Sequence, residues 1–237
     1  DTKLQIIDFF IEMSQASKKG KLDPTHIDLY KKLAKELADE DFSIHYEKGS
    51  YGVKERYGVD ITDYSAWADS GGKIPTTMHQ ANYNSLLSGR TPTIQFFIDL
   101  LLTNEKRFYS VMCSKLPTER IHDNSFFHVS MVKDSSGYSV AAHDDSQNIF
   151  TFLFYMPETD VNREFGLKVY KEGGTTHVET YDTPRNLEVA KQVDFIPNRM
   201  IIFAPSSGGA RTKTWHGINQ ISDKLVGTRN SFQIFFY

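Results

Sequence analysis

Apolar residues recur at helical spacing in several segments of the first half of the chain. Residues 4–13 show this period and predict a first amphipathic helix. Asp23 followed by Pro24 is typical of an N-cap and a first helical position, and predicts a second helix to about residue 38. Further helices are expected over residues 91–102 and over residues 107–114.

Residues 41–89, between the second and third predicted helices, are rich in Gly, Ser, Tyr, Asp and Asn and keep no steady period. Long irregular stretches inside compact domains are usually functional loops or disordered segments. We therefore expect this stretch to recognise a substrate, with His79, Asn82 and Asn84 inside it and Arg90 just beyond it.

Strand signals separated by turns dominate from Ser125 onward. Residues 125–132 and 229–237 alternate between apolar and polar positions, which predicts half-buried strands. The order of elements indicates a single domain of the α+β class. We expect a mainly helical part with irregular loops over residues 1–120 and a β-sheet core over residues 121–237.

Composition narrows the range of functions. The chain has 237 residues, of which 39% are hydrophobic, enough for one full core. A net charge of −3 provides no basic field, so no nucleic-acid partner is expected. No run approaches the roughly twenty apolar residues of a membrane span, so no membrane partner is expected. A single cysteine fits a reducing compartment and makes the cytoplasm the default location, while the oligomeric state stays open.

The most informative chemistry lies in the His-x-Asp pair of His143 and Asp145. Side chains alternate along a strand, so these two residues share a face while Asp144 points away. His216, which follows Trp215 far downstream, supplies a second imidazole. Two imidazoles and one carboxylate form the facial triad of non-haem Fe(II) oxygenases. Zinc accepts the same ligand types, so the ligands alone do not fix the metal.

A second pair stands on the last predicted strand, where Arg229 and Ser231 share a face. A planar guanidinium suits bidentate binding of a carboxylate, and a hydroxyl two residues on can donate a further hydrogen bond. A dicarboxylic acid could then chelate the metal at one end and be held by this pair at the other.

At these residues the chain resembles the 2-oxoglutarate and Fe(II)-dependent dioxygenases, in the branch related to prolyl hydroxylases, over about residues 126–237. The resemblance implies that His143, Asp145 and His216 bind iron. It also implies that Arg229 and Ser231 bind the distal carboxylate of 2-oxoglutarate. An acid at position 145 argues against the halogenases of this family, which carry a small residue there.

Four further residues are candidates for contacts with small molecules. In prolyl-hydroxylase relatives a tyrosine placed like Tyr155 helps to bind the cosubstrate carboxylate, and Tyr138 is a second candidate. The alternative for both is a core aromatic with a satisfied hydroxyl. His128 stands on an alternating strand and would face the substrate, whereas Arg211 would reach an acidic substrate or belong to a solvated loop.

The resemblance implies a double-stranded β-helix, the cupin-like jelly roll, with an N-terminal helical layer. It implies Fe(II) as cofactor and 2-oxoglutarate and O₂ as cosubstrates. The expected reaction hydroxylates an unactivated C–H bond of a small amino-acid-like molecule or of a prolyl or peptidyl residue, with release of succinate and CO₂. Desaturation or cyclisation would use the same iron site.

Two other classes remain open. The first is a cupin-type metalloenzyme that does not use 2-oxoglutarate, and the second is a jelly-roll binding module without catalysis. The segment Gly166-Leu-Lys-Val-Tyr170 departs from the Gly-Thr-x-Leu-Tyr that similar proteins often carry, which puts substrate contacts in doubt and leaves iron binding unaffected.

Overall fold

The computed structural model describes residues 4–8, 24–40, 44–46, 56–62, 92–103, 127–145, 148, 150–178, 180, 185–203 and 214–236. Within these ranges the helices are α2 (Pro24–Asp39), α5 (Pro92–Thr103) and a single 3-10 turn, η1 (Arg163–Phe165). The strands of the described part are β1 (Leu4–Asp8), β2 (Ile44–Tyr46), β3 (Arg56–Asp60), β4 (Phe127–Asp134), β5 (Val140–His143), β6 (Phe150–Tyr155), β7 (Lys168–Val178), β8 (Arg185–Gln192), β9 (Arg199–Phe203), β10 (His216–Ile218) and β11 (Arg229–Phe236).

These strands form two sheets. The larger sheet has the order β1-β9-β6-β11-β4-β3-β2, and the smaller has the order β5-β10-β7-β8. Neighbouring strands in both sheets are antiparallel. From β4 to β11 the chain passes repeatedly between the two sheets, so that β4, β6, β9 and β11 stand in one and β5, β7, β8 and β10 in the other. This arrangement is a jelly roll, the double-stranded β-helix predicted above.

The inner faces of the two sheets enclose a common apolar core. Leu153 and Tyr155 of β6 and Phe203 of β9 belong to the same buried cluster as Val169 of β7 and Ile218 of β10. A side chain on the inner face of any of these strands therefore points into the space between the sheets. Residues two apart along β6, β9 or β11 share this interior.

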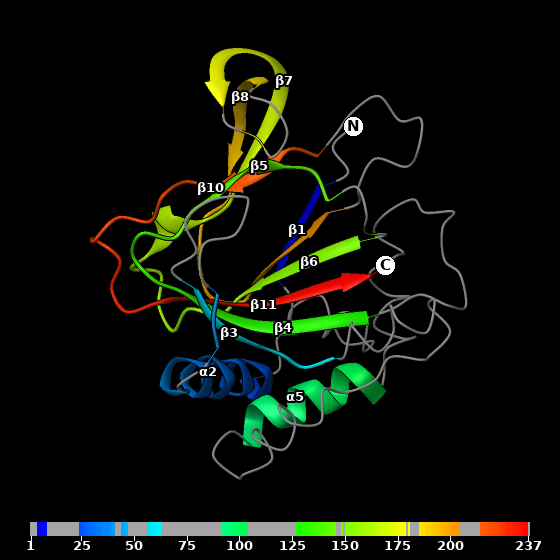
Figure 1. Cartoon of the computed structure of the whole chain (residues 1–237). Coiled ribbons are helices and arrows are strands. Elements are labelled where there is room, and N and C mark those ends of the chain that lie inside the picture. Colours follow the sequence, from blue (N-terminus) through cyan, green and yellow to red (C-terminus); the bar gives the residue numbers. More distant parts are fainter. Residues whose placement is uncertain are drawn as a thin grey trace.

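Helices α2 and α5 cover the outer face of the larger sheet (Figure 1). Leu33 of α2 and Phe97 of α5 are buried with Phe154 and Phe232, which point outward from β6 and β11. The ring centroids of Phe97 and Phe232 are 5.0 Å apart. Glu36 joins the helices, because its Oε2 accepts hydrogen bonds from the backbone N–H of residues 93 and 94 in the first turn of α5, at 2.8 and 2.9 Å.

Predictions for the first half of the chain are only partly confirmed. The helices expected over residues 24–38 and 91–102 are present as α2 and α5. The helix expected over residues 4–13 is wrong at its start, because Leu4–Asp8 is a strand that pairs with β9 at the edge of the larger sheet. A short apolar run fits both the helical and the strand period, and here these residues form a strand because they pair with β9 at the edge of the sheet. Residues 9–13 lie outside the described residues.

The expectation that residues 41–89 contain no regular structure is also wrong in part. Strands β2 and β3 extend the larger sheet beyond β4. They have 3 and 5 residues, too few to show an alternating pattern. The mainly helical part expected over residues 1–120 is therefore not confirmed, and the helix expected over residues 107–114 lies outside the described residues. Neither helix of the described part is long and apolar enough to cross a lipid bilayer.

Candidate metal centre

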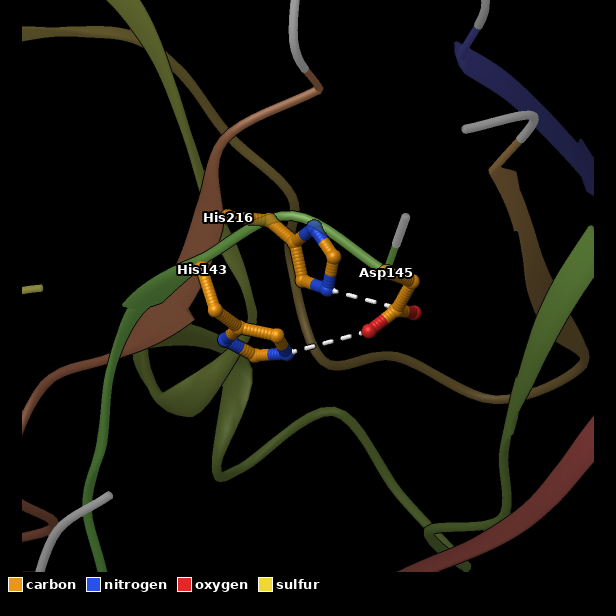
Figure 2. A group of neighbouring side chains, drawn as sticks. All are labelled: His143, Asp145 and His216. Carbon is orange, nitrogen blue, oxygen red and sulfur yellow. Dashed lines mark ion pairs between the residues drawn. The ribbon is translucent and has the colours of Figure 1, made fainter. Parts of the chain in front are cut away.

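The structure brings His143, Asp145 and His216 together at one edge of the smaller sheet (Figure 2). His143 is the last residue of β5 and His216 the first of β10, and these two residues are direct partners in the antiparallel pairing of the strands. Their ring centroids are 4.2 Å apart. Asp145 follows β5 by two residues and returns its carboxylate toward both rings.

The spacing of the three side chains fits one metal ion. The carboxylate oxygens of Asp145 lie 3.4 Å from His143 Nε2 and 3.7 Å from His216 Nε2. One ligand atom from each residue lies within 4.8 Å of the others. Ligand atoms about 2.1 Å from a metal lie about 3.0 to 3.4 Å from one another, depending on geometry, so a small closure of the group would suffice.

Hydrogen bonds fix which nitrogen of each imidazole faces the metal position. Nδ1 of His143 lies 2.9 Å from the carbonyl oxygen of Ala141, and Nδ1 of His216 lies 2.8 Å from that of Thr214. A carbonyl oxygen can only accept, so each Nδ1 carries a hydrogen and Nε2 is the nitrogen of each ring that faces the metal position. Burial lowers the pKa of His216 to about 4, assisted by the neighbouring His143 and opposed by Asp145 and the Thr214 carbonyl. At neutral pH His216 is therefore in the neutral form that binds metals.

The Asp145 carboxyl is ionised. Burial raises its pKa, but His216, His143 and a hydrogen bond from Thr151 together outweigh burial and hold the pKa well below its usual range. Thr151 Oγ1 donates to Asp145 Oδ2 at 2.6 Å, and Asn148 Nδ2 donates to Thr151 Oγ1 at 2.9 Å. Thr151 thus positions the carboxylate, and Asn148 fixes the direction of the Thr151 hydroxyl.

Replacing Thr151 with valine is expected to weaken Fe(II) binding about tenfold, because outer-shell hydrogen bonds to metal ligands contribute roughly ten- to hundredfold in affinity. Thr151→Val has nearly the same shape as the native residue and removes only the hydroxyl. Thr151→Ser keeps the hydroxyl and should restore tight binding. Anaerobic competition with a chromogenic chelator measures both. Equal affinities of the valine and serine variants would show that Thr151 contributes only packing.

Asp144 lies outside the group of ligands. Its Oδ1 accepts a hydrogen bond from the backbone N–H of Thr214 at 3.3 Å. The carbonyl of the same Thr214 accepts from His216 Nδ1. Asp144 therefore ties the segment that leads into β10 to the end of β5.

A cavity of about 140 Å³ opens beside the three ligands. Of the residues singled out from the sequence, Tyr138, His143, Asp145 and His216 line it. The other lining residues are Val140, Thr151, Leu153, Leu167, Phe203, Gly217, Ile218, Gln233 and Phe235. Sequence reasoning missed Gln233 and Phe235, although the alternation of β11 places both on the face of Arg229 and Ser231.

Arg229, Ser231 and Tyr155 do not line this cavity but lie further along the same inner face. Leu153 and Gln233 line the cavity, and Tyr155 and Ser231 are the next inward residues on β6 and β11, where they are direct partners. Ser231 Oγ is buried and has no hydrogen-bond partner within the part of the chain that the structure describes. Burial raises the pKa of the Tyr155 hydroxyl, although Arg229 opposes the shift, and this hydroxyl accepts a hydrogen bond from the backbone N–H of Leu167 at 2.9 Å.

The Arg229 guanidinium is completely buried and donates two hydrogen bonds to other parts of the protein. Its Nη1 donates to Asp134 Oδ2 at 2.7 Å, and its Nε donates to the carbonyl oxygen of Phe165 at 2.8 Å. Its central carbon lies 5.1 Å from the ring centroid of Tyr155 and 5.2 Å from that of Phe195. The interior thus has a cation at the far end from the candidate metal ligands.

The other two candidates differ in what the structure says of them. His128 stands on β4 opposite Phe235, with ring centroids 5.7 Å apart, and Phe235 lines the cavity while His128 is not among the described residues that line it. Arg211 lies outside the described residues, as do His79, Asn82, Asn84 and Arg90.

Fold and site together define a jelly roll with two histidines and one aspartate at a cavity between its sheets. This chain is similar to a solved structure described as a 2OG-Fe(II) oxygenase family oxidoreductase from Burkholderia pseudomallei. The similarity covers 99% of this chain and 85% of that chain, with 11% identity and a TM-score of 0.52. The chain therefore shares the fold of a 2OG-Fe(II) oxygenase.

Two further solved structures are similar to the chain with lower TM-scores. A prolyl-4-hydroxylase from Pseudomonas putida has 11% identity and a TM-score of 0.46, with 99% of this chain and 92% of that chain covered. A viral collagen prolyl hydroxylase from Paramecium Bursaria Chlorella virus-1 has 12% identity and a TM-score of 0.43, with 99% and 96% covered. Of these three structures, the one from Burkholderia pseudomallei has a TM-score above 0.5. No protein-family model and no curated protein sequence matches the chain.

Proposed function

We propose that this protein is an Fe(II)- and 2-oxoglutarate-dependent dioxygenase that hydroxylates an unactivated C–H bond, with release of succinate and CO₂. One observation carries the proposal: two imidazoles and an ionised carboxylate converge beside a cavity between the sheets of a jelly roll. This donor set fits Fe(II) and leaves other positions of the ion open to small molecules. When bound, the iron supplies O₂ activation and the oxidative decarboxylation of the cosubstrate.

The buried arginine favours iron with 2-oxoglutarate over a zinc or cupin-type site. His143, Asp145 and His216 would hold the ion that takes the 2-oxo acid end, and Arg229 would hold the distal carboxylate. Ser231 supports this role, because its buried Oγ has no hydrogen-bond partner among the described residues and can donate to a carboxylate. A metalloenzyme without 2-oxoglutarate would not need Arg229 to bind a cosubstrate carboxylate, and the arginine would serve only its buried ion pair with Asp134.

The remaining residues of the cavity orient the reactants and exclude water. Tyr155, next to Ser231, is proposed to contact the distal carboxylate, and Tyr138 is proposed to contact cosubstrate from the cavity wall. Leu153, Leu167 and Phe203 make the wall between the ligands and the arginine largely apolar. Apolar walls keep water away and strengthen electrostatic contacts inside.

A small amino-acid-like molecule is the proposed substrate, with a prolyl or peptidyl residue as the alternative. His128 and Arg211 are proposed as substrate contacts, His128 through its neighbour Phe235. The chain is proposed to act as one catalytic domain.

Succinate formation tests the proposal. The Fe(II)-loaded protein is incubated in air with 2-oxoglutarate, first alone and then with free amino acids and prolyl peptides. We expect slow succinate release that requires iron and O₂ and rises with a matching substrate. Tight iron binding without any succinate would instead favour a cupin-type metalloenzyme, and failure to bind iron would favour a non-catalytic jelly-roll module.

A further inference from the structure

The buried Arg229 already holds a carboxylate that belongs to the protein. Asp134 is its direct partner in the pairing of β4 with β11, and both side chains are completely buried. Asp134 Oδ2 accepts from Arg229 Nη1 at 2.7 Å, while Arg229 Nε donates to the carbonyl of Phe165. The guanidinium is thereby fixed at two of its nitrogens in the free protein.

This pair changes what the arginine can offer to a ligand. An isolated buried cation is strongly unfavourable, and Asp134 makes the buried Arg229 tolerable. The same negative charge repels any second carboxylate that approaches the guanidinium, and it does so in an interior of low effective dielectric constant. Asp134 therefore both supports Arg229 and competes with its proposed ligand.

A second arginine lies near the Tyr155 side of this interior. Arg199 stands on β9 two residues before Ile201, on the face that points between the sheets, and its charge acts on the neighbouring Tyr155 hydroxyl. Its Nη1 donates to the carbonyl of Asp194 at 3.5 Å, and its buried Nε has no hydrogen-bond partner within the described ranges.

From this arrangement we infer that Asp134 lowers the affinity of the site for 2-oxoglutarate. Its carboxylate holds Arg229 in place and, by repulsion, weakens the binding of the distal carboxylate of the cosubstrate to Arg229. The inference rests on the proposed use of 2-oxoglutarate and adds a residue that determines how tightly, and how selectively, that cosubstrate binds. Without the negative charge of Asp134, Arg229 would attract a distal carboxylate more strongly.

Asp134→Asn separates the positioning of Arg229 from the repulsion of the distal carboxylate. The amide oxygen can still accept a hydrogen bond from Arg229 Nη1, but the negative charge is gone. Binding is measured anaerobically by calorimetry on the Fe(II)-loaded full chain, with 2-oxoglutarate and with 2-oxopentanoate, which has the same chain length but no distal carboxylate. We expect the variant to bind 2-oxoglutarate about tenfold more tightly, from the removal of one like charge at short range. Its affinity for 2-oxopentanoate should not change.

Asp160→Asn is the matched control. It removes the same charge from an exposed pair with Arg163, at 3.1 Å, and should leave both affinities unchanged. The native protein provides a further test that needs no variant. Because Asp134 offsets the attraction between Arg229 and the distal carboxylate, 2-oxoglutarate should bind only about tenfold more tightly than 2-oxopentanoate.

The outcomes separate the inference from the function on which it rests. Unchanged or weaker binding of 2-oxoglutarate to Asp134→Asn would overturn the inference and leave the dioxygenase proposal intact. A thousandfold preference of the native protein for 2-oxoglutarate over 2-oxopentanoate would do the same. If the iron-loaded native protein bound no 2-oxoglutarate, both would fall.

Discussion

Asp145→Ala is expected to weaken Fe(II) binding by roughly a hundredfold or more, beyond the ten- to hundredfold effect of outer-shell residues. Asp145 provides the anionic ligand of the group, and the two imidazoles and Thr151 hold it ionised. Without it two imidazole ligands remain, and an imidazole that binds a metal does not compensate the charge of the ion. Competition with a chromogenic chelator under anaerobic conditions measures the loss.

Asp144→Asn is the control for this loss. It removes one carboxylate charge from the adjacent residue and keeps an oxygen that accepts from the backbone N–H of Thr214. Iron affinity should change by no more than a few-fold, because the side chain of Asp144 lies outside the group of ligands. If the two variants lost affinity equally, the strand register that separates the two aspartates would be contradicted.

Arg229→Ala is expected to weaken 2-oxoglutarate binding at least about a hundredfold while leaving Fe(II) binding in place. A hydrogen bond to a charged group contributes about 1.5 to 3 kcal/mol, and here the truncation also leaves the buried Asp134 without its cation. The uncompensated carboxylate would then repel the cosubstrate. Anaerobic titration of the iron-loaded variant with 2-oxoglutarate gives the affinity.

The same truncation threatens the fold, because breaking a buried ion pair costs about 3 to 5 kcal/mol of stability. The double variant Arg229→Met with Asp134→Asn removes both charges and should remain folded. Its affinity for 2-oxoglutarate should fall only about tenfold, since the repulsion disappears together with the attraction. Native affinity in both variants would mean that another cation, such as Arg199, binds the carboxylate.

Local pattern was sufficient for part of this architecture. The alternation of β11 placed Arg229 and Ser231 on one face, and a Pro at the first helical position marked the starts of α2 and α5. Pattern could not show that His216 pairs directly with His143, because the two strands lie far apart in sequence. The resemblance to a family implies that both histidines bind iron and does not give this pairing.

The residues that sequence reasoning missed depend on long-range pairing. Asp134 lies just beyond the alternating stretch of β4, and its ion pair with Arg229 spans 95 positions. Thr151 belongs to β6, which is buried throughout and shows no alternation that could mark one polar residue as important. Strand β1 was mistaken for a helix because its partner β9 follows it by almost the whole length of the domain.

The central claim is that iron held by His143, Asp145 and His216 binds 2-oxoglutarate through its 2-oxo acid end. Anaerobic titration of the Fe(II)-loaded protein with 2-oxoglutarate, followed by visible absorption, tests it most directly. We predict a weak metal-to-ligand charge-transfer band that grows with added cosubstrate and saturates at one equivalent per chain. Full iron loading with no such band at saturating 2-oxoglutarate would contradict the account.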